Sequence, residues 1–364
     1  MNANFFRKNW TYIILLALIV AVNILPGRGK QEKKQDRDIK AEESGLFVEF
    51  EDAKRRSEKI ERALKGDLPV YFLYIFLNAS IVFILLLGLT VDGYFVFGRL
   101  KGKNFFRETD NIDPPPWTLG DVFKIVILAV AATYALLMAY GFFVSLAEGI
   151  TKTKFGFYKN RNFSMIFNTV ILDFALLVTI IAFTKNIYKR KLSSLGFAKE
   201  NAARNVTYGI AGYVGIIPII VIVGIIIYIL LNVLKIKPPA QPIVGLFLAE
   251  KNVALIFISS AIAAVFGPVI EEIFFRGVMY NAVKRKLGVF WGIVITSVLF
   301  SFLHTHAPQY FLAGFLPIAI LGAALAYLYE KTGSLIPSIT LHVLNNVGSI
   351  FMVFLFKYFN NLTG

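Results

Sequence analysis

Long apolar stretches separated by short, mostly basic loops dominate this chain. Of its 364 residues, 57% are hydrophobic and only 17% are charged, whereas a soluble globular protein is usually about a quarter charged. The stretches lack the alternation of barrel strands, and backbone polar groups in lipid must be bonded internally. The sequence therefore predicts an all-α fold, a polytopic transmembrane helix bundle.

Nine stretches are candidates for membrane-spanning helices, because each is long enough to cross a hydrocarbon core of about 30 Å. We expect about eight or nine membrane helices, since one of the weaker stretches could be re-entrant or interfacial. The candidates are Trp10–Pro26, Pro69–Thr90, Val122–Leu146, Phe163–Thr184, Val206–Leu234, Asn252–Ile270 with its continuation, Gly288–His304, Phe311–Glu330 and Ser334–Lys357. An integral multi-pass protein of the cell membrane (plasma or inner membrane) is predicted, and the loop charges leave its orientation open.

Three parts follow one another along the chain. Residues 1–67 are expected to form a membrane anchor and a charged polar loop, residues 68–250 a first set of transmembrane helices, and residues 251–357 a catalytic helical core. Within the first part, Arg28–Asp67 is the one long polar stretch, and its second half, Glu51–Lys65, mixes both charge signs at helical spacing. This is typical of a solvated helix or a partly disordered loop rather than a binding site.

Net charge and cysteine content exclude several function classes. The net charge is +15, but the basic residues lie in loops between apolar segments, where they meet anionic lipid. We therefore expect the lipid bilayer, and no nucleic acid, as a partner. The chain has no cysteine, which excludes disulfides, a cysteine nucleophile and thiolate metal sites.

Two adjacent glutamates and an arginine stand where a membrane helix should carry no charge. Segment Asn252–Tyr280 is apolar until it presents Glu271, Glu272 and Arg276. An ionisable group in hydrocarbon costs roughly 2.5–3.5 kcal/mol on insertion scales, so such groups are rare and usually functional. Glu272 and Arg276 are four apart and can pair, whereas Glu271 is turned by about 100°. Glu271 is therefore predicted to act as a general base, unless all three form a structural ion-pair cluster.

Polar groups recur at four-residue spacing on the following two apolar stretches. His304 ends the run FSFLH, with Phe300 on the same face, and His342 shares a face with Asn346 in LHVLNNVG. A histidine and an asparagine inside a membrane helix cost free energy unless they have a function or are hydrogen-bonded to each other. Three such pairs in succession predict a shared polar cavity.

The set Glu, His, His and Asn supports two kinds of hydrolysis. In one, Glu271 with His304 activates a water while His342 and Asn346 donate hydrogen bonds to the developing oxyanion. In the other, two histidines and a glutamate hold a Zn²⁺ ion that acidifies a water. The residues alone do not decide between the two mechanisms. The cofactor could therefore be a divalent metal such as Zn²⁺, or there could be none.

These motifs resemble the signature of a known family. EEIFFR at Glu271–Arg276, FSFLH at Phe300–His304 and HVLNN at His342–Asn346 match the EExxxR, FxxxH and HxxxN pattern of the CAAX protease and bacteriocin-processing family. Its members are multi-pass intramembrane endopeptidases related to the Ras-converting CAAX prenyl endopeptidase. The resemblance covers Leu255–Phe356.

The resemblance implies a peptide or protein substrate at the membrane, hydrophobic or lipidated. It implies that Glu271 and His304 activate the water, that His342 and Asn346 form the oxyanion site, and that Glu272 and Arg276 support them. Members of the family are commonly called metalloproteases, so both mechanisms remain.

The motifs of other intramembrane proteases are absent from the sequence, and two other functions remain as alternatives. HExxH does not occur, and Asp173 lacks the partner aspartate of a GxGD protease, so it is interpreted as a hydrogen-bonded interhelical residue. His306 is interpreted as lying at the mouth of the site. The alternatives to an endopeptidase are a non-catalytic membrane scaffold or bacteriocin-immunity protein, and a proton-coupled transporter, which the lack of an internal repeat disfavours.

Overall fold

The computed structural model describes residues 3–24, 68–106, 114–156, 160–197, 201–234, 247, 250–305 and 311–363. The charged stretch Arg28–Asp67 and His306 lie outside these residues, so the expectations for them remain predictions.

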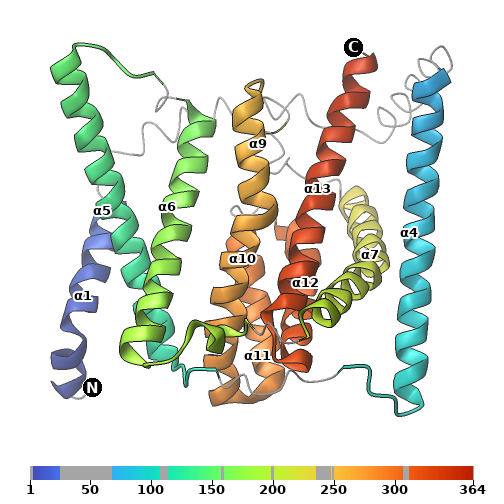
Figure 1. The fold of residues 1–364 in the computed structure, drawn as a ribbon, viewed down its shortest axis with the longest axis horizontal. Helices are drawn as coiled ribbons and strands as arrows, with labels where there is room; N and C mark the ends of the chain where they lie inside the picture. The colour runs from blue at the N-terminus through green and yellow to red at the C-terminus, as the bar shows by residue number, and fades with distance from the viewer. Residues whose placement is uncertain are drawn as a thin grey trace.

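Helices make up the regular structure of the described part of the chain, which confirms the predicted all-α fold. In chain order they are α1 (Ala3–Ile24), α4 (Leu68–Leu100), α5 (Leu119–Thr151), α6 (Arg161–Ala182), η2 (Phe183–Ile187), η3 (Leu192–Leu195), α7 (Ala202–Val233), α9 (Val253–Ala261), η4 (Ile262–Phe266), α10 (Gly267–Glu272), η5 (Ile273–Tyr280), α11 (Asn281–His304), α12 (Phe311–Thr332) and α13 (Leu335–Thr363). The long helices stand side by side, with α1, α5 and α6 on one flank and α4 on the other (Figure 1).

Seven helices of the described residues are long and apolar enough to cross a membrane. They are Leu68–Leu100, Leu119–Thr151, Asn162–Ile187, Ala202–Val233, Val253–His304, Ala313–Thr332 and Leu335–Phe359. Within α1 the apolar helical stretch Asn9–Val20 is shorter than a span. The chain is thus an integral multi-pass membrane protein.

The helix Val253–His304 contains two of the predicted spans, because it reverses direction at Gly288. Gly288 has φ 85° and ψ 172°, a backbone region that is essentially restricted to glycine. The two limbs then pack against each other, with the Phe275 and Phe300 rings 5.1 Å apart edge to face. Tyr280 likewise lies against Gly292, where a Cβ would approach the tyrosine ring to 2.8 Å. This hairpin brings Glu271 and His304 to the same depth.

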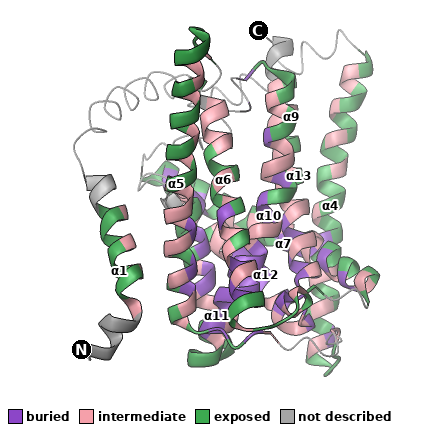
Figure 2. Cartoon of the chain, turned by 60° about the vertical axis from the view of Figure 1, so that its left-hand side comes forward, coloured by how far each residue is buried: buried purple, intermediate pink, exposed green. Residues whose placement is uncertain are grey.

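The buried core surrounds η5, and every residue of that segment is buried. Phe274, Phe275 and Tyr280 pack there with Ile180 of α6 and Leu335 of α13, among others. Buried residues gather around α10, α11 and α12 (Figure 2), and Glu272 and Arg276 of the EExxxR motif are fully buried, whereas Glu271 is partly exposed.

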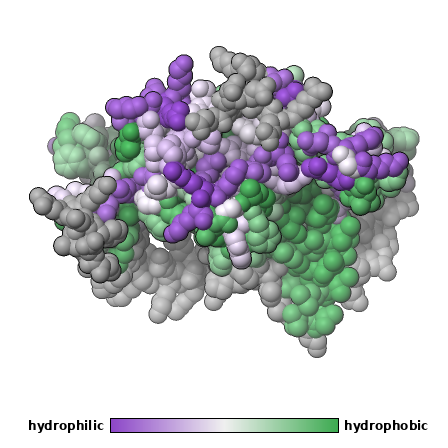
Figure 3. All heavy atoms as spheres, turned by 90° about the horizontal axis from the view of Figure 1, so that it is seen from below, coloured by the Kyte–Doolittle hydropathy of each residue, from purple (hydrophilic) through white to green (hydrophobic). Residues whose placement is uncertain are grey.

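One end of the bundle is hydrophilic, and loops are bonded there to helices α11 and α13. Arg285 Nη1 donates to the Pro116 carbonyl at 2.7 Å, and the Leu335 amide donates to the Gly196 carbonyl at 2.9 Å. Hydrophilic side chains spread over the middle of this end while the flanks are apolar (Figure 3). This distribution suits a molecule whose ends face water and whose sides face lipid.

Candidate active site

Glu272 and Arg276 form the expected ion pair, and both side chains are fully buried. Arg276 Nη1 lies 2.7 Å from Glu272 Oε1. Arg276 Nη2 also donates to the Gly322 carbonyl of α12 at 3.0 Å, and the guanidinium carbon lies 4.9 Å from the centre of the Phe300 ring. The arginine therefore joins α10–η5 to α11 and α12 in addition to neutralising the glutamate.

His342 of α13 binds the same carboxylate oxygen. Its Nδ1 lies 2.9 Å from Glu272 Oε1, and its side chain is only 2% exposed. Because Glu272 is paired with Arg276, its carboxylate accepts, and Nδ1 of His342 must donate. Helical spacing does not reveal this bond, because it joins residues of two different helices that are 70 positions apart in the sequence.

His304 is oriented by its own helix. Its Nδ1 lies 2.8 Å from the Phe300 carbonyl oxygen, and since a carbonyl only accepts, Nδ1 carries the hydrogen. The imidazole lies 4.3 Å from the Phe300 ring, centre to centre, as the four-residue spacing predicted. The Phe300 ring also contacts the His342 ring edge to face, with the ring centres 5.5 Å apart. It therefore packs against both histidines.

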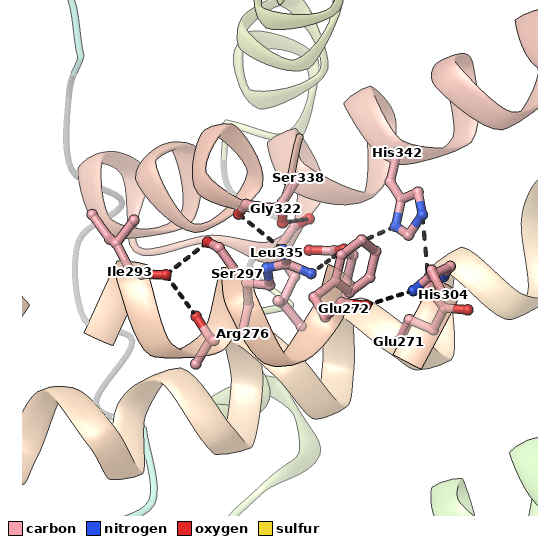
Figure 4. Close-up of polar contacts among 12 residues, drawn as sticks. Glu271, Glu272, Arg276, Ile293, Ser297, His304, Gly322, Leu335, Ser338 and His342 are labelled. Carbon is pink, nitrogen blue, oxygen red and sulfur yellow. Dashed lines mark hydrogen bonds and ion pairs between the residues drawn. The ribbon is translucent and has the colours of Figure 1, made fainter. Parts of the chain in front are cut away.

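Both histidines present their remaining nitrogen to Glu271. The Nε2 atoms of His304 and His342 lie 3.5 and 3.8 Å from Glu271 Oε2, and Figure 4 shows the three side chains converging. This oxygen is buried and has no hydrogen-bond partner among the described residues. The Glu271 and His304 side chains are nevertheless 30% and 36% exposed. A small polar molecule placed here would find three acceptor atoms and a route from outside.

Asn346 lies one turn beyond His342 and is bound to the bent helix that carries the glutamates. In the π-helical turn η4 the Gly267 amide bonds to the Ile262 carbonyl, and Pro268 has no N–H to offer. The Ala263 carbonyl instead accepts from Asn346 Nδ2 at 2.8 Å. One amide hydrogen of Asn346 is thus committed to structure, and the second remains for a ligand.

The described His, Asp and Glu side chains do not include a group of three or more that is arranged to hold a metal ion. Glu271, His304 and His342 nevertheless approach one another, and the Nδ1 bond to Glu272 leaves Nε2 of His342 free. A histidine that ligates a metal commonly has its second ring nitrogen bonded in this way, so hydrolysis with Zn²⁺ and hydrolysis without a metal both stay open.

Five of the six predicted site residues meet in one cluster, and Asn346 lies one turn from it. The position of Asp173 relative to Glu271 could not be read from the sequence. Asp173 was interpreted as a hydrogen-bonded interhelical residue; the described residues give it no hydrogen bond or ion pair, and its carboxylate interacts electrostatically with Glu271. Its charge inside an apolar span was the available signal.

Comparison with known proteins finds matches over the part of the chain that contains this cluster. Residues 253–348 match the family model described as "Type II CAAX prenyl endopeptidase Rce1-like", a segment that contains the cluster and the Gly288 hairpin. The resemblance to the CAAX protease and bacteriocin-processing family is confirmed. A curated protein of this kind, "Putative membrane peptidase YdiL" of Bacillus subtilis (strain 168), is 27% identical over 184 residues, which cover 50% of this chain and 70% of that protein.

Both matches are to membrane peptidases, so the broad class predicted from the motifs, a membrane-embedded protease, agrees with the family. No solved structure matches the chain.

Proposed function

We propose that this protein is an intramembrane endopeptidase that hydrolyses a peptide bond of a membrane-associated or lipidated protein. One observation supports this most strongly: both imidazoles have their Nδ1 hydrogens bound to protein acceptors, while both Nε2 atoms face Glu271 Oε2. Fixing one ring nitrogen sets the tautomer and aims the other, which is the orientation that general acid–base catalysis requires.

In the proposed reaction a water lies between Glu271 Oε2 and His304 Nε2. Glu271 removes a proton as the water oxygen attacks the carbonyl carbon, and the carbonyl oxygen becomes an oxyanion. The free amide hydrogen of Asn346 donates to that oxyanion. In the tautomer that donates from Nδ1, Nε2 of His342 is an acceptor, so it is a second donor to the oxyanion only when solvent has protonated the ring before the reaction, and the ring then keeps that proton throughout.

Collapse of the intermediate breaks the C–N bond. The proton taken from the water passes to the leaving amine, so Glu271 returns to its ionised form and no other reactant is consumed. Glu272 and Arg276 touch neither the water nor the carbonyl in this scheme. They hold His342 in place and neutralise each other inside the core.

The surroundings of His304 suit an apolar substrate. Phe302 and Leu303, just before His304 on α11, are 53% and 59% exposed. In a membrane these side chains face lipid or a hydrophobic segment. A substrate segment can therefore reach His304 laterally from the bilayer.

The test is a survey of protein termini in cells that express the wild type or Glu271→Gln at equal levels. We expect a set of new termini that disappears in the variant, while the matched change Asp92→Asn on α4 leaves them intact. Identical terminal profiles in the presence of folded protein would overturn the peptidase proposal and favour a scaffold or immunity protein.

The role of a metal is tested on the same activity. We expect the purified protein to keep its cleavage rate after treatment with a chelator and removal of the complexed metal. Loss of cleavage that returns on addition of Zn²⁺ would support the zinc mechanism instead.

A further inference from the structure

An aspartate of α6 faces the catalytic glutamate and is not used by the mechanism above. Asp173 shares a helix face with Leu176, Leu177 and Ile180, at spacings of three, four and seven residues. Leu176 and Leu177 pack against the central core, and Ile180 is fully buried in it. Leu172 and Phe174, its neighbours in the sequence, are exposed. Asp173 therefore points inward, toward the glutamate-bearing helix, and not toward lipid.

The helix that carries Asp173 lies beside the helix that carries Glu271. α6 packs against α5 and also against α9, α10 and η5, and the carboxylates of Asp173 and Glu271 are close enough to interact electrostatically. Two facing carboxylates repel each other. The nearest cation of the site offers no relief, because Arg276 is bonded to Glu272 and to the Gly322 carbonyl.

Asp173 has no hydrogen bond or ion pair within the part of the chain that the structure describes, and it is half-buried. A carboxylate in the hydrocarbon region without a partner is costly, and such residues usually serve a functional pathway or ligand. The described residues around Asp173 thus supply no hydrogen-bond donor to its carboxylate.

A peptide that is cleaved inside a membrane supplies such donors. Cleavage requires an extended backbone at the scissile bond, and an extended backbone in lipid leaves its N–H groups without partners. The site must then offer acceptors for these groups as well as donors for the oxyanion. Asp173 offers an acceptor from α6, which packs against the helix that carries Glu271.

We propose that Asp173 is a substrate-positioning residue, whose carboxylate accepts a hydrogen bond from a backbone N–H of the peptide next to the scissile bond. This inference rests on the proposed endopeptidase function. In this proposal α6 forms one wall of the peptide-binding site. The group that Asp173 recognises is the peptide backbone and not a cation of the substrate.

The experiment uses a synthetic peptide that spans a cleavage site found in the survey of termini, and the full-length protein in liposomes. The wild type, Asp173→Ala, Asp173→Asn and the control Asp92→Ala are compared by KM and kcat. Asp92 is another half-buried aspartate in a membrane helix, and it lies against Gly215 of α7. Thermal unfolding of each variant shows that all four proteins are folded.

We expect Asp173→Ala to raise KM about tenfold or more, because one hydrogen bond to a charged group is lost. The change in kcat should be smaller. Asp173→Asn keeps a carbonyl oxygen as acceptor and should stay within about threefold of the wild type. Binding of the same peptide to Glu271→Gln, measured by fluorescence anisotropy, should weaken by a similar factor when Asp173→Ala is added.

Three results would overturn the inference, and they differ from failure of the proposed function. Unchanged KM in Asp173→Ala would show that the carboxylate does not touch substrate. Equal defects in the Ala and Asn variants would show that a substrate cation, not an N–H group, is recognised. A wild type that cleaves no peptide and does not differ from Glu271→Gln would remove the proposed function, and this inference with it.

Discussion

His342 donates from Nδ1 to Glu272 at 2.9 Å, and this bond turns its Nε2 toward Glu271 at 3.8 Å. The two adjacent glutamates thus have different tasks. Glu272 is fully buried and orients a histidine, whereas Glu271 is partly accessible and faces both histidines. A side chain held in this way loses little freedom when substrate binds, which is how a supporting residue contributes to catalysis without touching the substrate.

Removing Arg276 should destabilise the protein strongly. Arg276→Ala leaves Glu272 as a buried charge whose remaining partner is His342, and breaking a buried pair costs roughly 3–5 kcal/mol. The control is Lys284→Ala, because Lys284 forms a 2.6 Å ion pair with Glu330 but is 39% exposed, and exposed pairs contribute about 1 kcal/mol or less. Thermal unfolding in detergent measures both, and similar stability of the two variants would contradict the pairing argument.

Phe300 should matter for both stability and turnover. Its ring is 1% exposed and contacts Phe275, His304 and His342. Phe300→Ala is expected to cost about 3–5 kcal/mol of unfolding free energy and to lower kcat, because His304 loses the surface that orients it. Phe83→Ala, at an exposed position of α4, should change neither by much. Wild-type kcat in a folded Phe300→Ala protein would show that His304 is held in place by other contacts.

The Asn346 bond to Ala263 should depend on Pro268. Asn346→Ala leaves the part-buried Ala263 carbonyl without its side-chain donor, which costs up to about 1–3 kcal/mol. Pro268→Ala restores a backbone N–H near that carbonyl, so the same asparagine change should cost less in its presence. Unfolding free energies of the two single variants and the double variant measure the coupling, and strictly additive costs would rule it out. Asn78→Ala on α4, whose amide bonds to Tyr74 of its own helix, is the control.

Gly288 should resist substitution because the hairpin depends on its backbone. At φ 85° and ψ 172° a side chain is strained, by about 1–3 kcal/mol, so Gly288→Ala should lower stability and shift His304 away from Glu271. Gly141 of α5 has open space around it, and Gly141→Ala in that helix should be neutral or stabilise by up to about 1 kcal/mol. The comparison is made by thermal unfolding together with cleavage rate, and equal effects would refute the strain argument.

Contacts within one helix could be predicted from the amino-acid sequence, and contacts between helices could not. The Glu272–Arg276 pair and the Phe300–His304 packing follow from the 3.6-residue period, which places residues four apart on one face whatever the helix packs against. The apolar runs likewise predicted the membrane helices, and the polar residues within them pointed to the site.

The bonds from His342 to Glu272, from Asn346 to Ala263 and from Arg276 to Gly322, and the position of Asp173 opposite Glu271, depend on the tertiary structure. They require the rotation of each helix about its axis and the depth at which it stands. The reversal at Gly288 sets that depth for His304, and the π-helical turns before and after α10 change the rotation by about 100° for each inserted residue. Packing of the whole bundle decides these quantities, because no local pattern of residues specifies how far one helix turns relative to another.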